Sequence, residues 1–166
     1  MVNEMIQLHS SACIHAPRKL VWQYLARLEN IELWSEQVVK SWCEKDLSQG
    51  VDSVRFCKLA NGTTIEERWT DWQEGYSYTY QGFNIPMIKR AENTWSVEAV
   101  GEQTLLTSKA IIELKGGIFG KLLEPLVTTV MKKMVPDSLA AFKYFVENGR
   151  PYEGKHSALP RAQITC

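Results

Sequence analysis

Hydrophobic and polar residues alternate along the first segment of the chain, over about residues 2–14. Ile6, Leu8, Ala12 and Ile14 fall on one face of an extended chain, and polar residues fall on the other. A period of two residues is the period of a β-strand that has one face buried. We therefore expect this segment to be a half-buried strand.

The hydrophobic period lengthens after Pro17, and the next residues are typical of helix. Pro17 suits the first turn of a helix, where the N–H that it lacks would have had no partner. One helical stripe follows, made of Leu20, Val21, Tyr24, Leu25 and Leu28. Asn30 can cap a second, short helix over residues 31–34.

The strand pattern returns after this helical region, interrupted by short turns. Six further strands are predicted, over residues 37–44, 51–59, 63–73, 76–81, 91–100 and 103–114. Asn61-Gly62 is the strongest hairpin signal, and a type I′ turn there needs positive φ at both central residues. Glu74-Gly75 and Gly101-Glu102 are short links of the same kind. Strands joined so closely are antiparallel neighbours, so we predict a seven-stranded sheet that includes the first strand.

A long apolar stripe at helical spacing follows the strands and predicts a helix within residues 118–148. Pro125 is expected to start the main helix after a short turn. Pro136 is expected to kink it, because proline removes a backbone hydrogen bond. Gly149 is a good helix terminator.

The order of elements predicts one α+β domain over residues 1–149, followed by a polar tail, residues 150–166, without regular structure. The apolar face of the antiparallel sheet must be covered, and the long C-terminal helix is the main cover available. A strongly twisted sheet cannot meet one helix closely along its whole length. We therefore expect a space between them that side chains fill or that stays open as an apolar cavity.

The strand periodicity also indicates which side chains face this space. Glu67 shares its predicted face with Ile65 and Trp69, and Tyr78 shares one with Tyr80. The other expected lining residues on the strands are Val54, Phe56, Asn93, Trp95, Val97 and Ser108. Trp34, in the second short helix, is expected to pack in the core, to line the cavity, or to do both, because ligand sites are mostly apolar and aromatic.

Composition and charge mainly exclude functions. Nineteen basic residues balance nineteen acidic residues, so the chain gives no support for nucleic-acid binding, which needs a basic surface. No apolar run of about 18 residues occurs, so we expect no stable membrane insertion. The cysteine and histidine spacings match no zinc motif, and no metal or cofactor is expected. A reduced, soluble, cytoplasmic protein is the default prediction, and the oligomeric state is left open.

Three stretches of the sequence resemble one family. IHAPRKLVWQYLARLENIELW is similar to the opening strand and helices of the START/Bet v 1-like (SRPBCC) helix-grip superfamily. GTTIEERWTDWQEGYSYTYQGFNIP resembles the middle strands of its polyketide cyclase/dehydrase-like branch, and DSLAAFKYFVENG resembles that branch's closing helix. The resemblance implies a helix-grip fold with a hydrophobic cavity between sheet and helix. Members bind lipids, hormones, polyketides or quinones, and some catalyse cyclisation or dehydration.

The resemblance also implies roles for single residues. Glu67 belongs to a Glu-Arg pair common in the branch, in which the glutamate faces the cavity and Arg68 points outward. Tyr78 matches an aromatic residue that lines the pocket in relatives. Val127, Met131 and Val135 match positions where the closing helix contacts ligand.

Three functions are compatible with the sequence. The first is the binding or carriage of a small hydrophobic molecule without any reaction. The second is a cyclase or dehydratase with Glu67 as general acid or base, because a carboxylate in an apolar pocket can be tuned for proton transfer, and with Tyr78 or Asn93 orienting the substrate. The third is a protein-interaction module with an incidental cavity.

The long helix raises one further alternative. Lys132 and Lys133 are interpreted as its solvated face. Membrane docking by these lysines, with Ile118 and Phe119 nearby, is the other interpretation.

Overall fold

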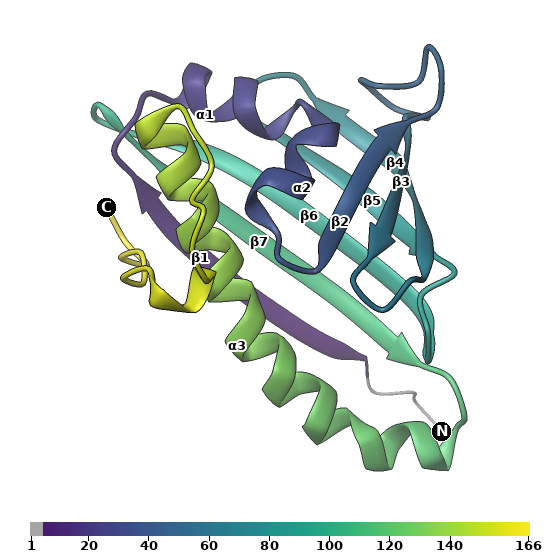
Figure 1. Ribbon diagram of the computed structural model, residues 1–166. Coiled ribbons are helices and arrows are strands. Elements are labelled where there is room, and N and C mark those ends of the chain that lie inside the picture. Colours follow the sequence, from purple (N-terminus) through teal and green to yellow (C-terminus); the bar gives the residue numbers. More distant parts are fainter. Residues whose placement is uncertain (1–4) are drawn as a thin grey trace.

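The computed structural model describes residues 5–166 (Figure 1). The strands are β1 (Ile6–Ile14), β2 (Val38–Cys43), β3 (Val54–Leu59), β4 (Thr64–Gln73), β5 (Ser77–Phe83), β6 (Ile88–Val100) and β7 (Gln103–Leu114). The helices are α1 (Arg18–Leu25), η1 (Leu28–Asn30), α2 (Ile31–Trp34), α3 (Ile118–Asn148) and η2 (His156–Ala158). Residues 2–4 of the first predicted strand lie outside the described residues.

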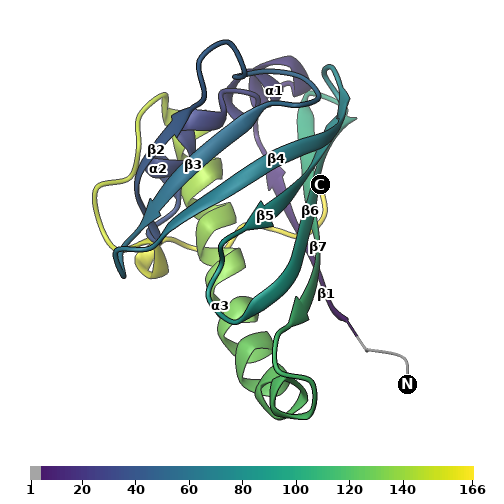
Figure 2. The ribbon, with the colours of Figure 1, turned by 90° about the vertical axis from the view of Figure 1, so that its right-hand side faces the viewer.

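The strands form one seven-stranded antiparallel sheet in the order β1-β7-β6-β5-β4-β3-β2. This confirms the predicted fold class, an α+β helix-grip arrangement with two short helices after the first strand and a long C-terminal helix. Strands β2 to β7 each pair with their neighbours in sequence, while β1 closes the order by pairing with β7. Figure 2 shows the sheet curving around α3, with β1 and β2 at its two edges.

The face of the sheet turned toward the helices, here called the inner face, carries the main core. Val21 and Leu25 of α1 and Phe142 of α3 pack against it. Close to α1 and α2 the space is filled by aromatic rings. The ring centroid of Trp34 lies 5.7 Å from that of Trp95 and 5.2 Å from that of Phe142.

The two halves of α3 have different surroundings. Its second half is buried at Leu139, Phe142 and Phe145, whereas Phe119 and Leu122 in its first half are exposed. Among the strands, β1 makes most of the contact with α3. Figures 1 and 2 both show the first half of α3 projecting away from β2 to β5. A single helix therefore covers only part of the inner face.

The start of α3 corrects one prediction. The helix begins at Ile118, so Pro125 lies inside it and does not start it. Pro136 also lies within the same continuous helix. The hydroxyl of Thr129 donates a 2.7 Å hydrogen bond to the backbone oxygen of Pro125, so this part of the helix has a side-chain bond in addition to its backbone bonds.

The hairpin at Asn61-Gly62 forms, but with a different turn. Only Gly62 has positive φ, at 88°. The backbone N–H of Leu59 bonds to the oxygen of Thr63, and the Asn61 side chain accepts a 2.9 Å bond from the N–H of Thr63. The loop is therefore longer than a type I′ turn and needs the left-handed conformation only at glycine.

The tail also departs from its prediction. It carries the short helix η2, and the N–H of Cys13 bonds to the oxygen of Gln163, which gives the edge strand β1 a partner. Leu159 and Ala162 pack against the main core. Cys13 and Cys166 form a disulfide, so the expectation that the cysteines are reduced is wrong for this pair. The tail is thus part of the packed structure.

Replacing Phe142 tests the packing of α3. Phe142→Ala is expected to lower the free energy of unfolding by about 3–5 kcal/mol, because the ring is fully buried against Trp34. Phe119→Ala, on the same helix, is the matched control: its side chain is 78% exposed, and the expected change is about 0.5 kcal/mol or less. Urea denaturation followed by circular dichroism measures both. Equal losses in the two variants would contradict the packing described here.

Candidate ligand-binding site

A buried ion pair lies on the inner face between β3 and β4. Arg55 and Glu67 are directly opposite each other across these strands. Nε and Nη2 of Arg55 donate to Oε2 of Glu67 at 2.6 and 2.5 Å. Nη1 donates to the backbone oxygen of Leu28 at 2.6 Å. The guanidinium therefore links the sheet to η1, and Glu67 lies on the inner face.

Arg55 is the main residue that the sequence interpretation missed. The expected inward residues of β3 were Val54 and Phe56, but these lie on the opposite face from Arg55 and Cys57. Phe56 stacks on Trp42 there, with 5.8 Å between ring centroids. The alternation of apolar residues on β3 favours the face that the structure turns outward. The negative charge of Glu67 could have indicated an inward Arg55, because opposite charges on facing strands stabilise each other.

Burial and charge act against each other at Arg55. Burial is the largest single effect and disfavours a charged guanidinium, but the carboxylate of Glu67, together with Cys57, Tyr80 and Tyr78, outweighs it and raises the pKa of Arg55 above its usual value. The guanidinium carbon also lies 4.9 Å from the ring centroid of Trp69 and 5.6 Å from that of Tyr80. These distances are within the range of cation–π attraction. Arg55 is therefore a permanent cation with one anionic partner and two aromatic neighbours.

Tyr80 stands at the boundary between this ion pair and the less buried part of the inner face. Its ring lies 4.7 Å from that of Trp69. Burial, followed by the negative charge of Glu67, raises the pKa of Tyr80 to about 12, against an opposing effect of Arg55. Its hydroxyl therefore keeps its proton at neutral pH and is able to donate a hydrogen bond.

A short polar chain continues from Tyr80 across β6 to β7. The amide nitrogen of Asn93 donates to the hydroxyl of Tyr80 at 3.4 Å. The hydroxyl of Ser108 donates to Oδ1 of Asn93 at 3.1 Å. Tyr80 and Asn93 are only half-buried although they lie on the inner face. These three predicted lining residues are thus brought together beside Arg55 and Glu67.

Other predicted residues pack into the aromatic core. Tyr78 is 2% exposed, and its hydroxyl donates to the oxygen of Leu25 at 3.4 Å. Its aromatic ring contacts the rings of Trp22, Trp69, Trp72 and Tyr80. Burial raises the pKa of Tyr78 well above its usual value. Trp34, Trp69, Trp95 and Val97 are buried in the same core. Ile65 is buried in a separate cluster with Val38 and Cys57, and Val54 is buried on the opposite face of β3.

The two thiols near the ion pair are poor nucleophiles. Burial, with the charge of Glu67 next, raises the pKa of Cys57 to about 12, and its Sγ lies 3.5 Å from Oε2 of Glu67. Burial, with the charge of Glu29 next, raises the pKa of Cys43 to about 11. Because the thiolate is the reactive form, neither group is suited to nucleophilic catalysis at neutral pH.

The predicted residues of α3 lie closer to β1 than to the ion pair. Val127 and Met131 pack against a small cluster that includes Ile6 and Leu8. Met131 and Val135 line a hollow of about 360 Å³ between β1 and α3. This hollow lies at the edge strand β1, and neither Arg55 nor Glu67 lines it.

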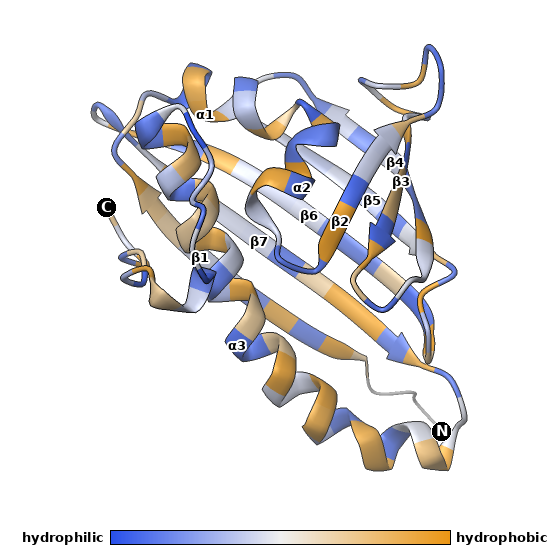
Figure 3. Cartoon of the chain, in the orientation of Figure 1, coloured by the Kyte–Doolittle hydropathy of each residue, from blue (hydrophilic) through white to orange (hydrophobic). Residues whose placement is uncertain are grey.

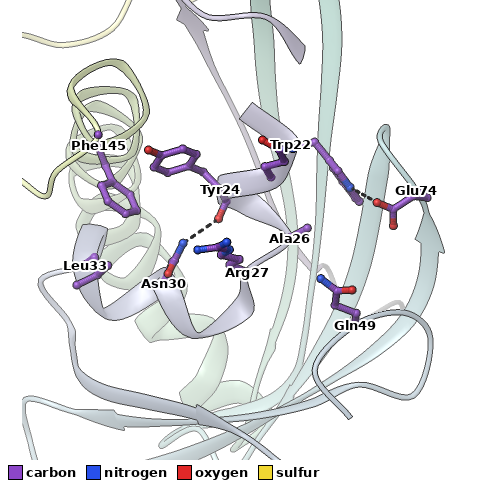
Figure 4. A pocket seen from close by; sticks show the side chains of 11 residues that line it. Trp22, Tyr24, Ala26, Arg27, Asn30, Leu33, Gln49, Glu74 and Phe145 are labelled. Atoms are coloured by element: carbon purple, nitrogen blue, oxygen red, sulfur yellow. Dashed lines mark hydrogen bonds between the residues drawn. The ribbon is translucent and has the colours of Figure 1, made fainter. Parts of the chain in front are cut away.

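A further hollow, of about 680 Å³, opens between α1, η1 and the end of α3 (Figure 4). Trp22 and Glu74 form one wall, and Nε1 of Trp22 donates to Oε1 of Glu74 at 2.8 Å. Arg27, Asn30 and Gln49 give it a polar lining. None of the site residues predicted from the sequence lines it, and neither Arg55 nor Glu67 does.

We also searched residues 5–166 for a metal site and for a helix that could span a membrane. Within residues 5–166, no cluster of histidine, cysteine, aspartate and glutamate is arranged to hold a metal ion. None of the helices in this range combines the length and apolarity that a membrane crossing needs.

Residues 5–147 match the family model described as polyketide cyclase / dehydrase and lipid transport. The chain therefore belongs to this family, and its resemblance to the helix-grip superfamily is confirmed. No curated protein matches the chain significantly.

Solved structures show the same fold at low sequence identity. XoxI from Bacillus cereus is 18% identical, with a TM-score of 0.71 over 87% of this chain and 97% of that protein. The ZhuI aromatase/cyclase from Streptomyces sp. R1128 is 16% identical, with a TM-score of 0.71 over 87% and 95%. A norcoclaurine synthase point mutant from Thalictrum flavum is 15% identical, with a TM-score of 0.66 over 90% and 98%.

Removing one partner of the ion pair tests its role. Arg55→Met is expected to cost about 3–5 kcal/mol of stability, because it leaves the Glu67 carboxylate buried without its counter-ion. Arg55→Met/Glu67→Leu is expected to recover much of that loss, because no buried charge remains. Urea denaturation of the wild type, both single variants and the double variant gives the coupling energy.

Arg68→Met is the matched control for this cycle. Arg68 pairs with Glu66 on the outer face of β4, and its side chain is 59% exposed. The expected change is about 1 kcal/mol or less. A loss at Arg68 as large as that at Arg55 would contradict the special position of the inner pair.

Proposed function

We propose that the protein binds a small, largely apolar molecule that carries a polar oxygen group, on the inner face between the sheet and α3. The observation that supports this most strongly is the position of Tyr80 and Asn93. Both lie on the inner face beside the buried Arg55–Glu67 pair, yet both are only half-buried. Polar groups that are fixed in place next to aromatic walls and still accessible are typical of ligand sites.

The arrangement of α3 supports a ligand at this place. The helix rests mainly on β1, and the aromatic core fills only the end of the inner face near α1 and α2. Toward the other end, Ala91 presents only a methyl group on the same face of β6 as Asn93, whereas the side chain of Ile85 lies over Gly82. A ligand that lies over Ala91, beside Ile85, would cover the half-buried side chains of Tyr80 and Asn93.

The polar groups indicate what the ligand carries. Tyr80, Asn93 and Ser108 form a hydrogen-bonded chain with both donor and acceptor atoms. Nε1 of Trp69 is buried and finds no hydrogen-bond partner among residues 5–166. A carbonyl or phenolic oxygen would accept from such donors. Aromatic ketones, quinones and phenols therefore fit the site better than plain hydrocarbons.

Ligand binding is expected to quench the fluorescence of the inner tryptophans. Naphthoquinone, a polyphenol and a long-chain fatty acid are suitable probes, titrated separately. Asn93→Ala is expected to weaken binding of the oxygen-bearing probes by about fivefold or more, because one hydrogen bond contributes about 1 kcal/mol. The absence of saturable quenching with all three classes would contradict the proposal.

Thr94→Ala is the matched control, one residue further along β6. Thr94 lies on the outer face, where its hydroxyl bonds to that of Thr79 at 2.8 Å. Probe affinity is expected to be unchanged in this variant. Equal weakening by both substitutions would indicate a general loss of structure.

A polyketide cyclase or dehydratase is the second candidate, favoured by the structural similarity to an aromatase/cyclase. In that case Glu67 is the proton carrier and Tyr80 or Asn93 orients the substrate. The geometry is less favourable to this role, because Oε2 of Glu67 already accepts from Arg55 and Cys57. Proton transfer at that oxygen would have to break the contact with Arg55.

Glu67→Gln separates the two candidates. If the protein is a cyclase, a reactive poly-β-ketone is cyclised by the wild type and no longer by the variant, while affinity for a naphthoquinone probe persists. High-performance liquid chromatography of the products measures cyclisation, and fluorescence titration measures the affinity for the naphthoquinone probe. Cyclisation that is undiminished in a folded Glu67→Gln protein rejects Glu67 as the acid or base.

A further inference from the structure

The outward side of the first half of α3 is unusually apolar for a surface. The side chains of Ile118, Phe119, Leu122, Leu126 and Val130, here called the α3 ridge, are 76%, 78%, 72%, 62% and 47% exposed. Figure 3 shows this part of the helix as predominantly hydrophobic. Contiguous exposed apolar side chains of this kind mark interaction sites.

The α3 ridge is not the face that packs on the sheet. Leu123, Val127 and Met131 point the other way and pack against β1 and β7 residues such as Ile112. The first half of α3 is therefore apolar on two sides, and the sheet uses only one of them. A helix that is apolar on two sides has more apolar surface than its contact with the sheet buries.

The loop between β5 and β6 adds one more exposed apolar side chain at this end of the molecule. The backbone N–H of Lys115 donates a 2.8 Å bond to the oxygen of Met87, which places this loop next to the start of α3. The side chain of Met87 is 53% exposed. The apolar surface thus occupies one end of the molecule and is not confined to one helix.

Positive charge accompanies the ridge. Residues 115–133 contain the exposed lysines Lys115, Lys121, Lys132 and Lys133 and a single acidic residue, Glu124. The chain as a whole has a formal net charge of +0. The local excess is therefore specific to this end of the molecule. Apolar side chains flanked by lysines complement an anionic lipid surface, which offers both acyl chains and negative headgroups.

We propose that the α3 ridge docks the protein on the surface of an anionic lipid bilayer. The helix lies in the interface, with Phe119 and Leu122 among the acyl chains and the flanking lysines on the headgroups. A second copy of this chain is a poorer occupant, because a two-fold interface through the ridge would bring the lysines of both copies together. This proposal does not depend on a ligand in the inner face.

Vesicle sedimentation tests the docking. The full chain is expected to pellet with vesicles of phosphatidylcholine mixed with phosphatidylserine, and to remain in the supernatant with phosphatidylcholine alone. Raised salt is expected to weaken binding, because it screens the lysines. Phe119→Ser/Leu122→Ser is expected to weaken binding about tenfold or more, because two large side chains no longer leave water. Lys121→Glu/Lys133→Glu is expected to weaken it by at least about twentyfold, at roughly fivefold for each lysine.

Matched variants control for general effects of polarity and charge. Val39→Ser/Ile164→Ser replaces two side chains that are 63% and 71% exposed elsewhere on the surface. Lys45→Glu/Lys58→Glu changes the net charge by the same amount as the ridge variant. Both are expected to bind vesicles as the wild type does.

Three results would overturn the docking. One is no binding to phosphatidylserine vesicles, and another is equal loss in the ridge and control variants. The third is a dimer in light scattering that Phe119→Ser/Leu122→Ser converts to monomer while vesicle binding stays unchanged, which would assign the ridge to self-association. Each is distinguishable from failure of the proposed ligand site, which is read with soluble probes in the absence of lipid.

Discussion

The structure depends on a mismatch of size between a seven-stranded sheet and the one long helix that covers it. A helix contacts its neighbours along a narrow stripe, and α3 uses that stripe on β1 and, less extensively, on β7. The remaining inner face has to be covered by other means. Near α1 and α2 this is done by large rings such as Trp34 and Trp95, whereas Tyr80 and Asn93 keep part of their surface accessible. The fold is thus closed at one end and less well covered at the other.

The buried ion pair is a consequence of the same geometry. Arg55 and Glu67 lie where the inner face turns from the aromatic core toward the more accessible half. Two charges out of water cost several kcal/mol unless good hydrogen bonds compensate them, and well-packed apolar residues often stabilise a fold as well. What an apolar pair could not provide is the directed bond from Nη1 of Arg55 to the oxygen of Leu28, which fixes η1 relative to the sheet. We infer that the pair serves mainly to set the relative positions of helices and strands around the site.

The sequence predicted the elements better than the faces of individual strands. The buried sides of β1, β4 and β6 were identified correctly from the alternation of residues. On these strands the polar and apolar side chains fall on clearly different faces. The prediction failed on β3, where the inward residue is an arginine and the outward Phe56 finds an aromatic neighbour in Trp42. Periodicity assumes that charge points to water, and a buried ion pair breaks that assumption. Only the pairing of β3 with β4 could have revealed it.

The start of α3 and the tail were mispredicted because the residues that contact them are distant from them in the sequence. The stretch before Pro125 is helical although the sheet covers only one of its sides, and the tail is held by β1 and the core. The two features that the sequence analysis left as open alternatives, the accessible inner face and the exposed start of α3, have one cause. The first half of α3 projects away from most of the strands. It therefore leaves part of the inner face of the sheet uncovered, and it exposes its own outward apolar side chains to solvent. Each surface is costly in water, and we propose a different apolar partner for each: a small molecule on the inner side and a lipid surface on the outer side.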